Sequence, residues 1–338
     1  MSVDSSAPAP GPSPNFGGGE NAEARASASS VLPLSPMVGG KGVGGIGGPF
    51  SNTPYLLATL PAALILALFF VLPAAWAIYL SFTNKALLGF NATSTHFIGL
   101  DNYRALGNVA DFRKFVWNTI VFVTGSAVVG QTGLGLALAL LLHHATGRGY
   151  RLAPLAYAAV LVAWISPPVF AGSVWGGIFE YRHGLLNTAL RKVGLGPVDM
   201  LGQYPMLSVI IADVWRGTAF AMVIFLGALQ TVPRTIYEAA RVDGAGTWQR
   251  FWDQTLPSLR HVIALVLLTT TLVTMGSFLL ILILTNGDPG YQTETIALFA
   301  YHRAFVQFEI GFGAAISVLM LAMNLLFAAL YLYLARVK

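Results

Sequence analysis

The most polar stretch of this sequence covers residues 231–258 and reads TVPRTIYEAARVDGAGTWQRFWDQTLPS. Charged side chains are scarce elsewhere, because only 10% of the 338 residues are Asp, Glu, Lys or Arg. Glu238, Arg241 and Asp243 bring carboxylate and guanidinium groups together here, and such groups form charge-assisted hydrogen bonds with a partner of opposite charge. The stretch therefore presents a charged surface to water or to another molecule.

The spacing of residues 232–258 predicts two short helices joined by a turn. Pro233 suits the first turn of a helix, where its missing N–H would have no partner in any case. Gly244 is well placed to end that helix, because glycine adopts the left-handed conformation at little cost. A second short helix follows and places three aromatic side chains on one side, namely Trp248, Phe251 and Trp252. We expect Leu256-Pro257 to end this helix and to begin the next apolar segment.

Asp213 and Arg216 are the ionisable residues that lie well inside a long apolar segment. Ionisable groups within a membrane are costly and mark functional sites. The two residues are three positions apart, so they share a helical face and can pair. Two interpretations stay open. The residues belong to the path of a substrate, or they form a mutual pair that is buried in the bundle or lies at a water-filled vestibule.

Uncharged side chains in other apolar segments are further candidates for a substrate path. These are Gln131, Thr274, Ser277 and Trp164. The ring of Trp164 can stack on a sugar ring, although tryptophan is also enriched at membrane interfaces. The amide and hydroxyl groups of the others equally hydrogen-bond neighbouring helices. The residue types leave both roles open.

Several kinds of chemistry find no support in the sequence. Cysteine is absent, which excludes disulfides and thiolate sites. His143, His144 and His302 have no carboxylate or histidine partner at metal-ligand spacing, so we assign no metal. Gly40-Lys41 resembles the end of a phosphate loop but lacks its upstream glycine and its Ser or Thr. The net charge of +5 is spread out, whereas nucleic-acid binding needs a concentrated basic face. We expect neither catalysis nor nucleic-acid binding in this chain.

The elements that position these residues are long apolar blocks. The chain is 55% hydrophobic, and each block exceeds the ~20 residues that a helix needs to cross a bilayer. We predict an all-α, polytopic membrane protein with six spans, at about 54–82, 116–142, 152–179, 205–230, 260–285 and 311–335. Pro167-Pro168 lies within the third block and predicts a kink there.

The two ends of the chain complete the predicted organisation. Residues 1–50 are rich in Gly, Pro and Ser, and such a segment buries too little apolar surface to fold, so we expect a disordered tail. Residues 51–338 form the membrane domain. With six spans both termini lie on one side, and a small excess of Lys and Arg there favours the cytoplasmic side.

The polar stretch resembles the EAA loop of permease subunits of bacterial ATP-binding-cassette importers. The resemblance rests on motifs that match in order and spacing: Glu238-Ala239-Ala240, Asp243-Gly244-Ala245, Leu256-Pro257, with Phe251 and Thr255 between them. The chain is also similar to the carbohydrate-uptake branch, of the maltose-transporter large-permease and glycerol-phosphate permease type, through the segments 184–187, 229–233 and 284–289. Together these likenesses cover residues 55–335.

The resemblance implies a type I importer fold, in the bacterial plasma (inner) membrane, with both termini cytoplasmic. It implies that residues 232–258 form a coupling helix that docks on a cytoplasmic ATPase. The expected partners are a second homologous permease, two ATP-binding-cassette ATPases and an extracytoplasmic substrate-binding protein. ATP and Mg would be bound by the ATPases, with no cofactor in this chain. In that family the places of Gly276 and Ser277 carry polar side chains that bind sugar, which puts a direct sugar site on this chain in doubt.

Three alternatives compete with this reading. The polar stretch could be an amphipathic helix on the lipid surface, but such a helix favours Lys and Arg, and here Glu238 and Asp243 accompany Arg241. A secondary transporter driven by an ion gradient would show repeated halves with interrupted helices. A membrane-embedded enzyme would need clustered His or acidic residues near one interface. We find neither of these last two patterns in the sequence.

Overall fold

The structure is a computed structural model that describes residues 53–336. It divides into a unit of residues 1–64 and a unit of residues 65–338. The tail predicted at residues 1–50 lies outside the described residues. The described part is helical, and its β pairing is a single bridge between Thr83 and Phe97. The predicted all-α class is therefore confirmed.

The first half of the described chain, up to the long central helix, contains ten α-helices and two π-helical segments. They are α2 (Thr53–Leu66), a π-helix (Ala67–Val71), α3 (Leu72–Ser81), α4 (Phe90–Thr93), α5 (Asp101–Gly107), α6 (Phe112–Val123), a π-helix (Thr124–Gln131), α7 (Thr132–Gly147), α8 (Ala153–Ile165), α9 (Pro168–Phe179), α10 (Leu185–Lys192) and α11 (Met200–Gln203).

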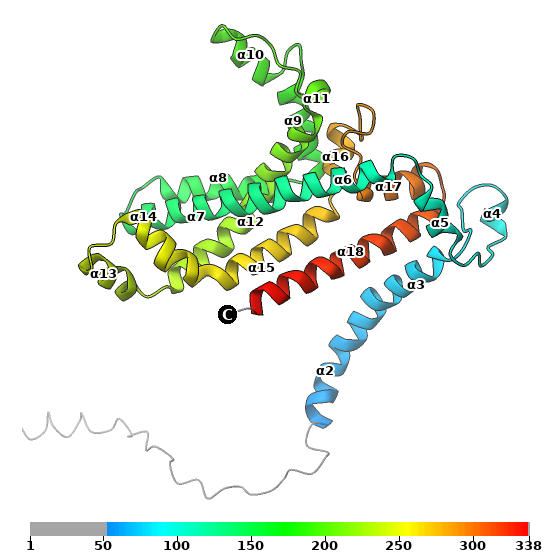
Figure 1. Ribbon diagram of the computed structural model, residues 1–338, viewed down its shortest axis with the longest axis horizontal. Coiled ribbons are helices and arrows are strands. Elements are labelled where there is room, and N and C mark those ends of the chain that lie inside the picture. Colours follow the sequence, from blue (N-terminus) through cyan, green and yellow to red (C-terminus); the bar gives the residue numbers. More distant parts are fainter. Residues whose placement is uncertain (1–52, 337–338) are drawn as a thin grey trace, which may run out of the picture. The chain divides into compact units, whose positions relative to one another are not determined.

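The second half starts at the central helix and runs to the C-terminal helix. Its elements are α12 (Pro205–Thr231), α13 (Arg234–Val242), α14 (Thr247–Arg250), a π-helix (Phe251–Thr255), α15 (Leu256–Met275), α16 (Leu279–Leu284), α17 (Ile296–Tyr301), a π-helix (His302–Val306) and α18 (Ile310–Arg336). In the unit of residues 65–338, α13 and α14 lie at one end and α4 and α5 at the opposite end (Figure 1).

Five continuous helices in the described chain are long and apolar enough to cross a membrane. They are Thr59–Ser81, Phe112–Gly147, Pro205–Thr231, Thr247–Met275 and Ile310–Tyr333. A sixth span results if α8 and α9 are counted together, although they meet at an angle of 107°. Proline explains this break, because Pro167 and Pro168 lack N–H donors and the residue before a proline avoids the helical region. Ser166 is accordingly extended, with ψ 127°.

The fifth apolar block departs from the predicted span 260–285. Its helix begins earlier, at Thr247, and ends at Met275. Gly276 caps the end of α15, and α16 is a separate short helix from Leu279, packed on α9. Glycine is the weakest helix former after proline, which favours a break at this position. The long helix thus ends one residue after Thr274.

Helix α12 lies at the centre of the bundle and packs on α7, α8 and α15. The buried side chains of Met222, Phe225 and Leu229 on α12 form one core cluster with residues of α7 and α15. Helix α7 approaches α12 closely at Gly135, where an added Cβ would lie 2.5 Å from Cβ of Ala221. Small residues permit such close backbone contact between membrane helices.

Candidate functional site

Helix α13 and the turn that follows it form a projection, which we call the knob (residues 234–245). The helix ends at Val242, and the turn that caps it contains Gly244, whose φ is +81°. The amide of Ala245 donates to the carbonyl of Ala240 (2.9 Å), and the amide of Gly244 donates to the carbonyl of Arg241 (3.1 Å). These two bonds define a Schellman motif, which satisfies the last carbonyls of a helix. The predicted helix end at Gly244 is confirmed.

One side of the knob contacts the π-helical turn before α15 and the other side is exposed. Ala240 is buried, and the hydroxyl of Tyr237 lies 3.2 Å from Oγ1 of Thr255. Glu238, Ala239, Arg241 and Asp243 are exposed, and Ala245 is half-buried. Val242 is 88% exposed, so the outer surface combines charges with an aliphatic side chain.

The second short helix does not end at Leu256-Pro257, contrary to the sequence prediction. Residues Thr247–Met275 form one continuous helix, in which α14 passes through the π-helical turn Phe251–Thr255 into α15. A proline inside a helix leaves one carbonyl without its donor. The wider π-helical turn directly before Pro257 accommodates this irregularity, as π-bulges do in other helices.

Three aromatic rings gather beside the knob at the start of this helix. The ring centroids of Trp248 and Phe251 are 5.7 Å apart, and those of Phe251 and Trp252 are 5.5 Å apart. The side chains of Trp248 and Trp252 are exposed by 72% and 49%, and Phe251 is half-buried. The predicted clustering of these rings is confirmed, but two of them face outward.

A buried polar network joins three elements near the middle of the bundle. Nε2 of Gln131 donates to Oδ2 of Asp213 (2.8 Å) and, over a longer distance of 3.4 Å, to Oγ1 of Thr274. Asp213, Gln131 and Thr274 are all buried. Gln131 belongs to the π-helix before α7, Asp213 to α12 and Thr274 to α15. The network therefore holds these three elements in register.

Arg216 lies at the edge of this network, next to Asp213. Its Nη2 lies 3.7 Å from Oδ1 of Asp213, its side chain is 17% exposed, and its Nε is buried without a hydrogen-bond partner. The predicted pairing on one helical face is confirmed. The spare donor leaves Arg216 able to bind one more acceptor.

Two predicted residues lie outside the network. Trp164 on α8 is 45% exposed and packs its ring on Phe220, with the centroids 6.0 Å apart. Ser277 is half-buried beyond the end of α15, where its amide donates to the carbonyl of Thr274 (3.0 Å). The structure therefore brings together Gln131, Asp213, Arg216 and Thr274, with Ser277 adjacent in the chain.

An ionisable pair between α16 and α18 was not foreseen from the sequence. Oε1 of Glu294 lies 2.8 Å from Nδ1 of His302. The seven residues between them contain a short helix, and neither helical nor strand periodicity places two such residues together. Within residues 53–336 no group of three His, Asp or Glu side chains is arranged to hold a metal ion.

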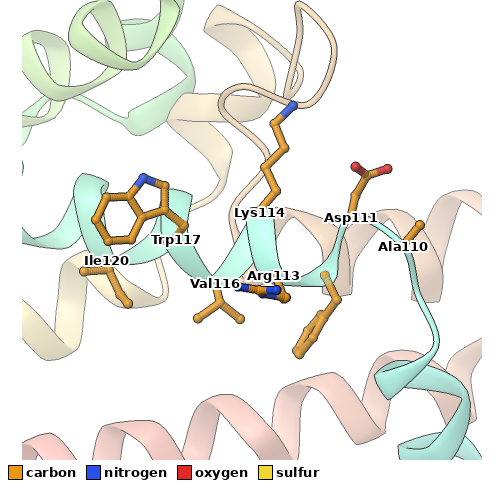
Figure 2. Close-up of a pocket in the computed structure, with 8 residues that line it drawn as sticks. Ala110, Asp111, Arg113, Lys114, Val116, Trp117 and Ile120 are labelled. Carbon is orange, nitrogen blue, oxygen red and sulfur yellow. The ribbon is translucent and has the colours of Figure 1, made fainter.

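An open groove of about 680 Å³ runs along the first turns of α6. Its lining includes Arg113, Trp117 and Ile120, and Figure 2 shows the Lys114 side chain extending away from them. Nζ of Lys114 donates to the carbonyl of Gly290 in the loop before α17 (2.6 Å). None of the predicted site residues lines this groove.

The sequence of this chain is similar to the sequences of known transport proteins. The family model described as "Binding-protein-dependent transport system inner membrane component" matches residues 49–337. The chain is 32% identical to the sulfoquinovosyl glycerol transport system permease protein of Agrobacterium fabrum, covering 84% of this chain and 91% of that protein. It is 33% identical to the trehalose/maltose transport system permease protein of Thermococcus litoralis, covering 83% and 93%.

A solved structure shares the fold. It is that of a bacterial alginate ABC transporter in complex with an alginate pentasaccharide-bound periplasmic protein. The match has a TM-score of 0.70 at 21% identity and covers 85% of this chain and 96% of that chain. The predicted type I importer fold is therefore confirmed.

Proposed function

Since this chain belongs to the family of binding-protein-dependent transport system inner membrane components, we propose that it is the permease subunit of an ATP-driven importer for a sugar or related polyol compound. The names of its relatives support that substrate class. Two of them are named as permease proteins of transport systems for sulfoquinovosyl glycerol and for trehalose or maltose. The protein is a multi-pass membrane protein with five to six apolar spans.

The knob is the observation that carries the proposal. A surface that transmits force must be rigid, and the Schellman motif at Gly244 fixes the end of α13. Its exposed face offers Glu238, Arg241 and Asp243 for charge-assisted hydrogen bonds across a contact. The aromatic rings of Trp248 and Trp252 enlarge that face, and aromatic residues are enriched at protein interfaces.

The proposed partner at the knob is one of two cytoplasmic ATP-binding-cassette ATPases, which would bind ATP and Mg. A second, homologous permease would line the pathway with this chain, and an extracytoplasmic binding protein would deliver the substrate. The chain itself would supply no catalytic group. This arrangement puts the knob and both termini in the cytoplasm.

ATP would act through the equilibrium between two states of the membrane bundle. A ligand shifts such an equilibrium by as much as its affinity differs between the states. Closure of the ATPases would move the knob, and because Tyr237 contacts Thr255, that movement would reach α15 through the π-helical turn that continues into it. Thr274 lies at the other end of α15, within the buried network, so the same helix connects the knob to the centre of the bundle.

The substrate pathway is proposed to pass beside the network of Gln131, Asp213 and Thr274. Both carboxylate oxygens of Asp213 face protein partners, which assigns Asp213 to holding the helices together. Arg216 has an unpartnered donor, and Ser277 lies where α15 breaks. We propose that these two residues meet a substrate and that the exposed ring of Trp164 contacts lipid or the partner permease.

The proposal is tested by uptake into proteoliposomes that contain the chain with its co-purified subunits. The substrate is the compound that mass spectrometry identifies in the co-purified binding protein. We expect uptake to require ATP on the knob side and binding protein on the other side, and to persist when ionophores collapse all ion gradients. Uptake by the chain alone, without ATP and abolished by ionophores, would show a secondary transporter instead.

A further inference from the structure

The open groove along the first turns of α6 belongs to none of the sites that the transport proposal uses. It measures about 680 Å³. Three charged residues line it, namely Asp111, Arg113 and Lys114, and the rest of its lining is uncharged (Figure 2). The groove lies at the end of the unit of residues 65–338 that is opposite the knob (Figure 1).

One exposed stripe of α6 forms the edge of this groove. Arg113 is exposed, and the side chains of Trp117 and Ile120 are exposed by 63% and 42%. Residues spaced by four and by seven positions lie on one face of an α-helix. Thr124, which is also exposed, continues this face into the π-helical segment. The polarity of the stripe therefore falls along the helix, from a cation through an amphipathic ring to an aliphatic side chain.

Aromatic side chains show where this stripe meets the surface of the bilayer. Trp and Tyr are enriched at membrane–water interfaces. Trp117 lies near the start of the second span, and Trp76 and Tyr79, exposed by 60% and 49%, lie near the end of the first span. The end of one span and the start of the next are on the same side of a membrane, so the three rings mark one interface. Arg113 precedes Trp117 by four residues, or about 6 Å of helix, which puts it among the lipid headgroups.

The charge of the groove is positive. Within residues 53–336 Arg113 has no ion-pair partner, and Nζ of Lys114 donates to a backbone carbonyl, that of Gly290. Asp111 is the one acid in the lining, and two residues of helix turn it about 200° away from Arg113. Figure 2 shows its carboxylate pointing away from Val116. Two cations and one acid leave a net positive charge at the mouth of an otherwise uncharged groove.

We propose that this groove binds one anionic phospholipid, with the phosphate on Arg113, the glycerol region beside Trp117 and an acyl chain along Ile120. The polarity of the stripe follows that of a phospholipid from headgroup to tail. A guanidinium binds two phosphate oxygens at once, and a positive surface favours a headgroup with a net negative charge over a zwitterionic one. The inference goes beyond the proposed transport function and does not depend on it, because it requires only that α6 spans the membrane.

The test compares two phospholipids at one reporter. The chain has no cysteine, so Thr124→Cys, labelled with a bimane fluorophore, places a single reporter at the tail end of the groove. The chain and its co-purified subunits are reconstituted in mixtures of phosphatidylglycerol and phosphatidylethanolamine. One lipid carries a nitroxide on an acyl chain, which quenches a nearby fluorophore. Exchanging the label between the two lipids gives their relative affinities for the groove.

We expect the groove to prefer phosphatidylglycerol about fivefold, the effect of one basic side chain on an anionic headgroup. Arg113→Gln should abolish this preference, and Arg113→Lys should retain part of it. Asp111→Asn should increase it, because this variant removes the acid and the Asp111 side chain makes no cap hydrogen bond. The control Arg182→Gln changes an exposed arginine outside the groove and should leave the preference unchanged.

Three results would overturn the proposal. The first is equal affinity for the two lipids in the parent, and the second is an unchanged preference in Arg113→Gln. The third is quenching by neither lipid, which would show that protein, such as a second permease, fills the groove. None of these results depends on transport, so a failure of the transport proposal would not alter them.

Discussion

At the scale of single residues, the question is what Asp213 does inside the membrane. Its side chain is 1% exposed, and its two oxygens face Gln131 and Arg216. Removal of one partner from a buried polar cluster leaves the others unsatisfied, at a cost of about 1–3 kcal/mol. A residue in this position therefore contributes to stability whether or not a substrate passes nearby.

We predict that Asp213→Ala lowers the thermal unfolding midpoint of the detergent-solubilised protein, with a loss of about 1–3 kcal/mol. Asp213→Asn retains the shape and an acceptor for Gln131, so it should lose less. Uptake should fall in parallel with stability for every sugar that the system transports. If Asp213→Ala instead left the midpoint unchanged and altered which sugars compete for uptake, Asp213 would be a substrate-contacting residue.

At the scale of elements, two glycines in the turn after α13 make a matched pair. Gly244 has φ +81°, and Gly246 has φ −65°. A Cβ at either position would meet no atom within 4 Å, so the two sites differ in backbone conformation alone. Side chains other than glycine are disfavoured in the left-handed region by roughly 1–2 kcal/mol.

We predict that Gly244→Ala strains the end of α13 and reduces uptake, whereas Gly246→Ala is neutral. Capture of substrate by the binding protein should be unaffected in both. Glu238→Ala should also reduce uptake, because it removes a charge from the exposed face of the knob without touching the core. Uptake and ATP hydrolysis are measured on the reconstituted complex. Equal activity of Gly244→Ala and the parent would argue against a rigid coupling element.

A second pair of glycines tests the packing of α7 on α12. An added Cβ at Gly135 would lie 3.0 Å from the backbone nitrogen of Met222, whereas one at Gly133 would meet nothing within 4 Å. Overpacking of a core costs about 1–3 kcal/mol. We therefore expect Gly135→Ala to lower the thermal unfolding midpoint and Gly133→Ala to leave it unchanged. Similar midpoints for both variants would mean that α7 can move away from α12 at little cost in stability.

The elements also show which features the sequence could predict. The end of α13 at Gly244 and the break at Pro167 follow from local backbone rules, and both predictions succeeded. The continuation of the helix through Pro257 did not follow, because a π-helical turn compensates for the missing donor. The early end of α15 at Met275 was missed because residues 276–285 are as apolar as the span before them.

At the site, the sequence could predict one half of the polar network and not the other. Asp213 and Arg216 share a helix, so a spacing of three residues was enough to pair them. Their meeting with Gln131 and Thr274 depends on how three elements pack, which no local pattern encodes. The pair of Glu294 and His302 was hidden for the same reason.

At the scale of the whole molecule, the central claim is that the knob faces the cytoplasm and couples a partner ATPase to the bundle. The knob and the loop around Thr95 lie at opposite ends of the unit of residues 65–338 (Figure 1). Three spans separate these two loops if α8 and α9 count as one. The two loops must then lie on opposite sides of the membrane.

Labelling of single cysteines in intact cells tests this claim most directly, since the natural chain contains no cysteine. Arg241→Cys places a thiol on the exposed face of the knob, and Thr95→Cys places one at the other end. We predict that a membrane-impermeant maleimide labels Thr95→Cys in intact cells and labels Arg241→Cys only after the membrane is permeabilised. Labelling of Arg241→Cys from outside intact cells would put the knob on the wrong side and would contradict the account.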